Sequence, residues 1–355
     1  MSPPYGQVDR QRWAHSLGVS EYAVELLLSC EVFDQHVDSF IWHRLFGYDL
    51  CAWHDAGPLA ARWLGQSDLP RLRAGGVGGA AWVITTNPWR RPRARLRALI
   101  ANYTNLSREL SRVEANACIV NSYAEYNRSR SRGKHAALVA LQGGNALSDR
   151  ASAGVFPLNR LLRVTLVHLT NSDIGHTSSP ANRQPDAGML PRGRELIHEL
   201  ESNLVLVDLA HASKGTFWDA VAEHTKSRPL VVSHTGFASV TPHWRNLDDQ
   251  QARAIADSGG VIGVLYHAQF LGDPPWGGRI ASVARHIAHG INLLGAEHIT
   301  LGSDWDGMIA TPLDMPTCLE LPRLVQSLLD AKLSEQQIAM VLGRSFLDML
   351  ARARP

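Results

Sequence analysis

Histidine and aspartate residues recur at the ends of short apolar runs in this sequence of 355 residues. The first run, EVFDQHVD, ends in a His-x-Asp pair, and four later runs end in, or are followed by, a single histidine or aspartate. The residues at these five places are His36 with Asp38, His168, His211, His234 and Asp304. Imidazole nitrogens and carboxylate oxygens are typical ligands of zinc and similar divalent ions. Together in one cavity they would form a metal site that activates water and polarises a carbonyl group.

Each of these residues also has an ordinary structural explanation. A lone histidine near a strand end is more often a hydrogen-bonded structural residue than a metal ligand, and this chain has 16 histidines. Asp304 alone fits a helix N-cap after the last apolar run, and Asp306 fits that position too. Five coincidences on separate runs are much harder to accept, so the combined pattern favours a metal site.

The elements that must position these residues are eight short apolar runs, which predict β-strands. They cover residues 31–38, 79–87, 136–144, 163–171, 204–213, 229–236, 260–266 and 298–307. Helix-like stretches separate them, among them residues 93–130, 192–202 and 246–259. Alternating strands and helices predict parallel strands with crossover helices, and eight strands favour a closed (β/α)8 barrel of the TIM type. All the candidate residues would then lie at its carboxyl-terminal mouth, where barrel enzymes have their active sites.

No repeat, low-complexity tract or long linker divides the chain. We therefore predict a single barrel domain over residues 1–355, with an N-terminal extension (1–30) and C-terminal helices (334–355) that pack outside the barrel. The terminal segment opens with a capping-box pattern, Ser334 and Gln337. A long polar loop, residues 175–193, follows the fourth strand and is expected to line the ligand site.

The composition excludes several functional classes. Arginine is abundant but the net charge is only +2, so no strong positive field favours nucleic acid, and the arginine-rich run 89–99 indicates the solvated start of a helix. The four scattered cysteines predict reduced thiols, without a disulfide framework or a zinc knuckle. The N-terminus has no signal-peptide pattern, and the apolar stretch 23–33 is too short to span a membrane. We expect a cytoplasmic protein.

Six segments, in order along the chain, resemble the membrane (renal) dipeptidase-like metallopeptidases, peptidase family M19 of the amidohydrolase superfamily. The segments are DQHVD (34–38), DLPRLRAGGVGGAAW (68–82), VDLAHAS (207–213), VVSHTG (231–236), HWRNLDDQQARAIADSGGVIGV (243–264) and LGSDWDG (301–307). The fold implied by the resemblance is the barrel that the strand count predicts. The implied activity is zinc-dependent hydrolysis of dipeptides, and the implied assembly is a homodimer.

The resemblance also implies roles for single residues. His36 and Asp38 would bind a first zinc ion, and His211 and His234 a second. His168 would polarise the substrate carbonyl or hold the developing oxyanion, and Asp304 would transfer protons during attack and leaving-group departure. Arg245 would pair with the C-terminal carboxylate of the substrate. Outside its HWRN context, Arg245 would be expected to form a loop salt bridge.

One position departs from the family pattern. The third predicted strand should end in Glu-Gly, with the glutamate bridging both metal ions, but this chain has Gln142 in the run LVALQGG. A glutamine offers a single neutral oxygen as ligand, and its amide nitrogen cannot bind a metal. Four consequences are open: a silent replacement, a weakened metal pair held by hydroxide and Asp304, a mononuclear centre, or a retained pocket without hydrolysis.

Three functions follow from this pattern. The first is a zinc-dependent hydrolase that cleaves the amide bond of a dipeptide or a small N-acyl amino acid. The second is a repurposed enzyme of the same fold that modifies a specialised metabolite with an altered metal site. The third is a non-catalytic binding protein, which the retention of Arg245 and Asp304 disfavours, because neither is needed merely to fold.

Overall fold

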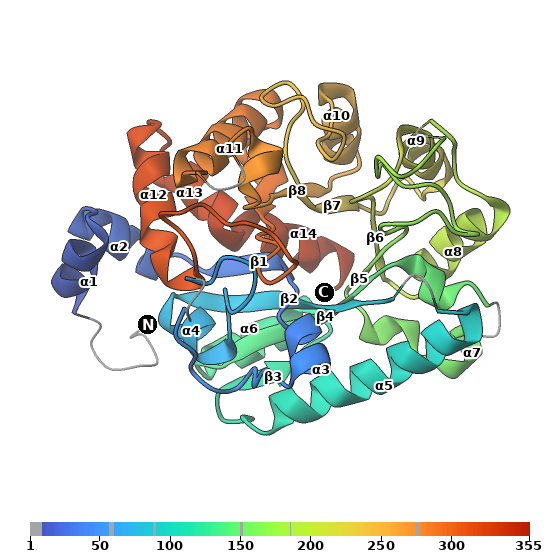
Figure 1. Ribbon diagram of the computed structural model, residues 1–355, viewed down its shortest axis with the longest axis horizontal. Coiled ribbons are helices and arrows are strands. Elements are labelled where there is room, and N and C mark those ends of the chain that lie inside the picture. The colour runs from blue at the N-terminus through green and yellow to red at the C-terminus, as the bar shows by residue number, and fades with distance from the viewer. Residues whose placement is uncertain (1–8, 57–59, 88–89, 150–151, 185, 275–276) are drawn as a thin grey trace.

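The computed structural model describes residues 9–56, 60–87, 90–149, 152–184, 186–274 and 277–355, and it is an α/β barrel of parallel strands. Eight strands form the closed barrel (Figure 1). They are β1 (Val32–Val37), β2 (Val77–Thr85), β4 (His135–Gln142), β5 (Arg163–Thr165), β6 (Leu206–Asp208), β7 (Leu230–Thr235), β8 (Val261–Val264) and β9 (Ile299–Leu301). Each lies within or overlaps one of the eight predicted runs, so the predicted (β/α)8 barrel is confirmed.

Pairing between β2 and β4 closes the barrel. This ladder runs from Gly79 opposite Ala136 to Thr85 opposite Gln142. Because every pairing is parallel, the carboxyl ends of all strands meet at one mouth. The register therefore places Thr85 and Gln142 side by side at that mouth.

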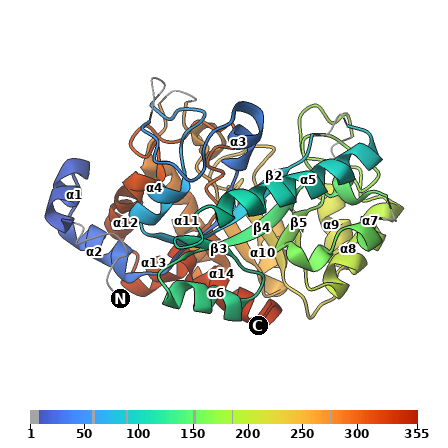
Figure 2. The same cartoon turned by 90° about the horizontal axis from the view of Figure 1, so that it is seen from below.

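Helices surround the barrel, and α1 and α2 lie together at one side of it (Figures 1 and 2). Those before β5 are α1 (Arg10–Leu17), α2 (Glu21–Ser29), α3 (Phe40–Phe46), α4 (Leu69–Ala74), α5 (Pro92–Ser111), α6 (Tyr123–Ser131) and α7 (Ser152–Val155). Those after β5 are α8 (Pro191–Ser202), α9 (Lys214–Glu223), α10 (Asp249–Asp257), α11 (Ile280–Leu294), α12 (Leu321–Asp330), α13 (Glu335–Ala339) and α14 (Ser345–Ala353).

The C-terminal helix α14 packs against the amino-terminal end of the barrel. Its Phe346 stacks on Phe33 of β1 with ring centroids 4.2 Å apart, in a buried cluster that includes Leu138 and Ala140 of β4. The predicted capping box is present, because Ser334 accepts from the Gln337 backbone and Gln337 bonds back to residue 334. Aliphatic and aromatic side chains of β1, β4 and α14 thus form a buried cluster at this end of the barrel.

One predicted helix is wrong in part. The stretch 93–130 is not continuous, because it contains α5, a short strand β3 (Ala117–Ile119) and α6. Strand β3 pairs with the first residues of β4, from His135 to Ala137. Tertiary pairing decides this segment, since a three-residue strand gains its stability from a neighbour that local sequence does not reveal.

Three other expectations concern the cysteines, the arginine-rich run 89–99 and membrane-spanning helices. All four cysteines are free thiols, as predicted. The described arginines of the run 89–99 lie before and within the start of α5, where Arg93 has an 89% exposed side chain; Trp89 and residues 1–8 lie outside the described residues. In the described part of the chain, no helix combines the length and apolarity required for a membrane span.

Candidate metal centre

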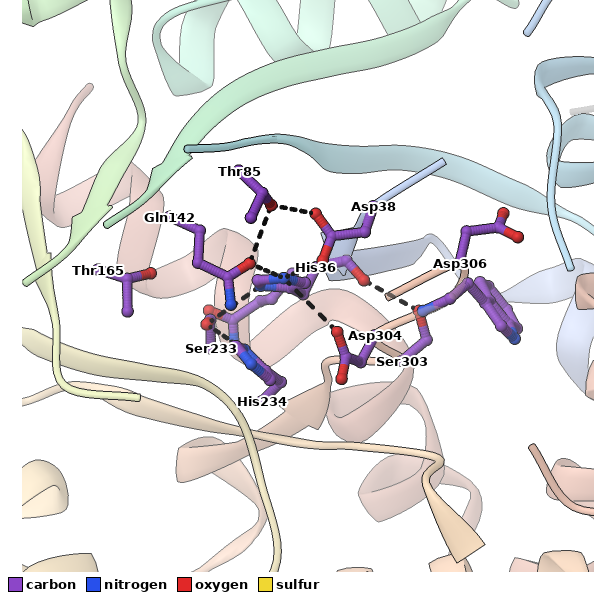
Figure 3. Close-up of polar contacts among 12 residues, drawn as sticks. His36, Asp38, Thr85, Gln142, Thr165, Ser233, His234, Ser303, Asp304 and Asp306 are labelled. Carbon is purple, nitrogen blue, oxygen red and sulfur yellow. Dashed lines mark hydrogen bonds and ion pairs between the residues drawn. The ribbon is translucent and has the colours of Figure 1, made fainter. Parts of the chain in front are cut away.

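The end of β1 places His36, within the strand, and Asp38, directly after it, side by side at the barrel mouth. His36 Nε2 lies 3.2 Å from Asp38 Oδ2 and 3.7 Å from Asp304 Oδ1 (Figure 3). Both side chains of the His-x-Asp pair therefore point into the same cavity, as the sequence predicted. Asp38 Oδ1 accepts a hydrogen bond of 2.8 Å from the Thr85 hydroxyl, which fixes the carboxylate against β2.

The Gln142 amide lies between two groups of candidate ligands. Its oxygen is 3.1 Å from His36 Nε2 and 3.2 Å from the Thr85 hydroxyl. Its nitrogen is 3.0 Å from His211 Nε2. In Figure 3 the amide lies with Thr85 on one side and His234 on the other. Gln142 thus occupies the central position of the site, at the end of β4.

The chain leaves β4 through two glycines, Gly143 and Gly144, at positions where a side chain would clash with its neighbours. Gly143 has φ +103°, a left-handed conformation that L side chains rarely adopt, and a Cβ there would lie 2.7 Å from Thr86 Oγ1. A Cβ on Gly144 would lie 2.8 Å from the Leu166 carbonyl oxygen. The chain therefore turns tightly against β5 immediately beyond the amide.

His211 and His234 form a second group beside the first. Their Nε2 atoms are 2.9 Å apart, and the ring of His168 meets the His211 ring edge-on at 4.7 Å between centroids. His168 Nδ1 is buried and has no hydrogen-bond partner within the described part of the chain. Burial lowers the pKa of His168 to about 4 and the pKa values of His211 and His234 well below 6.5. All three imidazoles are therefore neutral at pH 7, which is the form that binds metals.

A buried layer of polar residues orients His234 from below. Asp208 Oδ2 accepts hydrogen bonds from Arg163 (2.6 Å), Thr165 (2.6 Å) and the Ser233 hydroxyl (2.7 Å). Because Ser233 donates its single proton to Asp208, its oxygen accepts from His234 Nδ1, 2.8 Å away. The Nε2 lone pair of His234 is then directed into the cavity, as second-layer hydrogen bonds do in metal sites.

Asp304 follows β9 in a strained conformation, with φ +63°. Burial and the neighbouring Asp38 carboxylate raise the pKa of Asp304 well above its usual range. Neither Asp304 nor Asp306 caps a helix, so that alternative is wrong. Asp306 instead accepts hydrogen bonds from the backbone N–H groups of Gln66 and Ser67, and so ties the loop before α4 to the mouth.

Arg245 is 4% exposed and lines a cavity of 340 Å³ beside His211. Its guanidinium donates a hydrogen bond of 2.7 Å to the backbone carbonyl oxygen of His234. This contact is with a backbone group and is not the loop salt bridge that the residue alone would suggest. Burial lowers the pKa of Arg245 to about 10, which leaves the side chain cationic at neutral pH. Ser178 and Asp186 of the polar loop 175–193 line the same cavity, as that loop was expected to do.

The donor set fits a divalent cation. Among the described residues, His36, His234 and Asp304 form a group whose ligand atoms all lie within 4.8 Å of one another. His36 Nε2 also lies 3.2 Å from Asp38 Oδ2 and 3.1 Å from the Gln142 oxygen, so nitrogen and oxygen atoms of the kinds that bind divalent ions lie close together.

The structure brings all eight sequence-derived site residues to one mouth: His36, Asp38, Gln142, His168, His211, His234, Arg245 and Asp304. Sequence reasoning did not single out Thr85, Arg163, Asp208 or Ser233 as part of the site. One signal was present, since an arginine opens the apolar run 163–171 and a buried charge needs a partner. Thr85 carried no comparable signal.

Comparison with known proteins identifies the family of this chain. Residues 20–354 match the model of the family described as membrane dipeptidase (peptidase family M19). The chain belongs to the M19 family. The M19 relatives include dipeptidase aclJ of Aspergillus oryzae, 26% identical over 338 residues that cover 92% of this chain and 79% of that protein. An uncharacterised Klebsiella pneumoniae protein is 34% identical over 180 residues, which cover 49% of this chain and 64% of that protein.

Solved structures show the same M19 fold. A metallopeptidase from Rhodobacter sphaeroides, solved with a phosphinate mimic of the dipeptide L-Ala-D-Ala, aligns with TM-score 0.80 at 23% identity. The alignment covers 91% of this chain and 99% of that one. The probable dipeptidase PvdM from Pseudomonas aeruginosa aligns with TM-score 0.80 at 19% identity, covering 98% and 99% of the two chains. The barrel thus has the fold of these solved structures.

Proposed function

We propose that this protein is a zinc-dependent hydrolase that cleaves the amide bond of a dipeptide or a small N-acyl amino acid. The observation that carries the proposal is the convergence of three imidazoles and two carboxylates beside a buried arginine: His36, His211, His234, Asp38, Asp304 and Arg245. Membership of the M19 family supports this assignment.

The residues that would hold the cation are the histidines and aspartates of the mouth. When bound, zinc lowers the pKa of a water molecule and polarises a carbonyl group. Asp304 has a second carboxylate oxygen besides the Oδ1 that faces His36, and we assign it the proton transfer from the attacking water to the leaving amine. His168, neutral at pH 7, is assigned the N–H hydrogen bond to the developing oxyanion.

Arg245 would fix the end of the substrate that does not react. A buried guanidinium pairs strongly with a carboxylate, because water does not compete for its N–H donors. The cavity beside Arg245 is lined by the apolar Leu209 and Leu247 and by Trp244, which is 41% exposed. We therefore assign this cavity to the C-terminal residue of the substrate, with space for an apolar or aromatic side chain.

The experiment is metal analysis of the purified chain combined with kinetics on a panel of dipeptides. We expect bound zinc, turnover of some dipeptides, and a KM raised about 10- to 100-fold by Arg245→Met, the loss of a charge-assisted hydrogen bond. A dipeptide with an amidated C-terminus should show a similar defect with the unaltered enzyme. A chain without zinc that hydrolyses no dipeptide would refute the proposal.

A second candidate function is favoured by Gln142 alone. Its amide nitrogen, directed at His211, replaces a metal ligand with a hydrogen-bond donor. The fold would then serve a narrower reaction on a specialised metabolite. Ordinary turnover of common dipeptides would eliminate this alternative.

A further inference from the structure

A second arginine lies at the barrel mouth, on the side opposite Arg245. Arg44 is on α3, the helix that follows β1, and its guanidinium donates a hydrogen bond of 2.8 Å to the carbonyl oxygen of Thr85, the last residue of β2. Arg245 makes a similar bond to the carbonyl oxygen of His234, near the end of β7. Three strands separate β2 from β7 in either direction, β1, β9 and β8 one way and β4, β5 and β6 the other. The two guanidinium groups are therefore attached to opposite sides of the mouth.

Candidate metal ligands lie between these two arginines. Asp38 is on the Arg44 side, because its carboxylate accepts a hydrogen bond of 2.8 Å from the Thr85 hydroxyl. His234 is on the other side, because its carbonyl oxygen is bonded to Arg245. A substrate whose C-terminal carboxylate pairs with Arg245, and whose scissile carbonyl group lies at the metal centre, therefore extends its amino-side half toward Arg44.

Arg44 has N–H donors to spare for a further anion. A guanidinium has five N–H donors, and within the described part of the chain the half-buried Arg44 side chain makes a single hydrogen bond, the one to Thr85. Its charged neighbours are the Asp38 carboxylate and the exposed Arg90. Burial lowers the pKa of Arg44, Asp38 raises it and Arg90 lowers it. The side chain nevertheless stays cationic, since an arginine in a protein does not lose its proton.

The charges on this side of the mouth favour an anionic ligand. Asp38 is a candidate metal ligand, so a cation bound there would take up its negative charge. Arg44 and Arg90 are then two neighbouring cations, and in the described residues neither forms an ion pair with a carboxylate. A carboxylate placed between them would relieve their repulsion and accept charge-assisted hydrogen bonds, for which the planar arginine fork is suited.

We propose that Arg44, with Arg90 beside it, binds a carboxylate on the amino-side half of the substrate. The preferred substrates are then dipeptides with an N-terminal aspartate or glutamate, or amino acids acylated by a dicarboxylic acid. The inference rests on the proposed hydrolase function and specifies its substrate class. Arg44 supplies most of the preference, because it is half-buried, whereas water and salt screen the exposed Arg90.

The test compares two dipeptides of the same shape, Glu-Leu and Gln-Leu, which differ in one charge on the amino-side residue. For the zinc-loaded full chain we expect kcat/KM to be about 10- to 100-fold higher for Glu-Leu, the factor that a hydrogen bond to a charged group contributes. Arg44→Met should bring the ratio of the two kcat/KM values to about one, whatever happens to the absolute rates. Arg90→Gln should lower the ratio only about 2- to 3-fold, because Arg90 is exposed.

The matched control is Arg228→Met. The guanidinium of Arg228 also donates to a backbone carbonyl, that of Ala353 at 3.4 Å, but Arg228 precedes β7 and so lies at the opposite end of the barrel from the mouth. This variant should keep the ratio of the unaltered chain.

Each result supports or overturns the assignment. A ratio near one in the unaltered chain, or an unchanged ratio in folded Arg44→Met, overturns it and leaves the hydrolase function intact. If that variant does not fold, Arg44→Gln replaces it, because a glutamine keeps an N–H donor but has no charge, and the same loss of the ratio is expected.

Hydrolysis of neither these two nor any other dipeptide would refute the proposed function, and the binding of the same pair then decides the role of Arg44. Titration calorimetry measures the two dissociation constants in the zinc-loaded chain. Tighter binding of Glu-Leu that Arg44→Met abolishes supports the carboxylate site, and equal binding of the two dipeptides overturns it.

Discussion

The ion pair between Arg163 and Asp208 offers a quantitative test of how the site is supported. Both side chains are fully buried, with Arg163 donating at 2.6 Å to Asp208 Oδ2. The same oxygen also accepts from Thr165 and Ser233, while Oδ1 accepts from the backbone N–H groups of Ala210 (3.1 Å) and Ser233 (3.0 Å). These hydrogen bonds and the Arg163 charge hold the pKa of Asp208 below 3.8, although burial opposes them.

The change Asp208→Asn keeps the shape of the side chain and removes its charge. If the asparagine oxygen stays on the backbone N–H groups, its NH2 faces three donors that previously bonded to a carboxylate. Arg163 is then a buried cation without its partner, and removal of one partner of a buried pair typically costs about 3–5 kcal/mol. We expect the free energy of unfolding to fall by that amount. Ser233 would also lose its hydrogen bond to Asp208 and would hold the His234 ring less firmly. We therefore expect zinc binding to weaken about 10- to 100-fold.

Equilibrium unfolding in urea, followed by circular dichroism, measures the change in the free energy of unfolding. The control is Glu25→Gln, which breaks the surface pair between Arg10 and Glu25, whose side chains are 50% and 52% exposed. It should change stability by less than about 1 kcal/mol. A loss below about 1 kcal/mol for Asp208→Asn would refute the reasoning, because it would mean that Arg163 is solvated or paired elsewhere. In a double variant with Arg163→Met, the two losses should be less than additive.

Two further predictions concern the strand that carries Gln142. Gly143→Ala should lower stability by about 1–3 kcal/mol and reduce zinc content, because Gly143 has φ +103° and a Cβ would press on Thr86. Gly154→Ala, where a Cβ meets nothing within 4 Å, is the control, and equal effects of the two changes in urea unfolding would contradict this account. Burial lowers the pKa of His135 to about 3, and its ring accepts from Trp82 and donates to the Val77 carbonyl, so only the neutral form fits. The stability that neutral His135 contributes is therefore fully present above pH 6.5 and is lost as the pH falls toward 3. In the unaltered chain this accounts for about 2 kcal/mol of the decrease in the free energy of unfolding between pH 7 and pH 5, and His135→Gln should abolish that part of the decrease. If urea unfolding shows the same decrease in the variant, His135 is not its source.

The sequence by itself determined the barrel and most of the candidate ligands. Strand residues that are apolar on both faces appear as short continuous runs, and parallel strands must end at one mouth, so His36, His211 and His234 could be placed together in advance. The departure at Gln142 was also visible, because residue type is a property of the sequence. The long helical pattern before β4 concealed β3, since that strand forms only by pairing with β4.

Tertiary structure alone decided how those residues interact. The pairing of β2 with β4 brings Thr85 to the Gln142 oxygen, and no local signal predicts that contact. The place of Arg163 beneath His36 depends on residues 127 positions apart in the chain. Hydrogen-bond direction depends on which donors surround each acceptor in space, so the partners of the Gln142 amide follow from the folded arrangement.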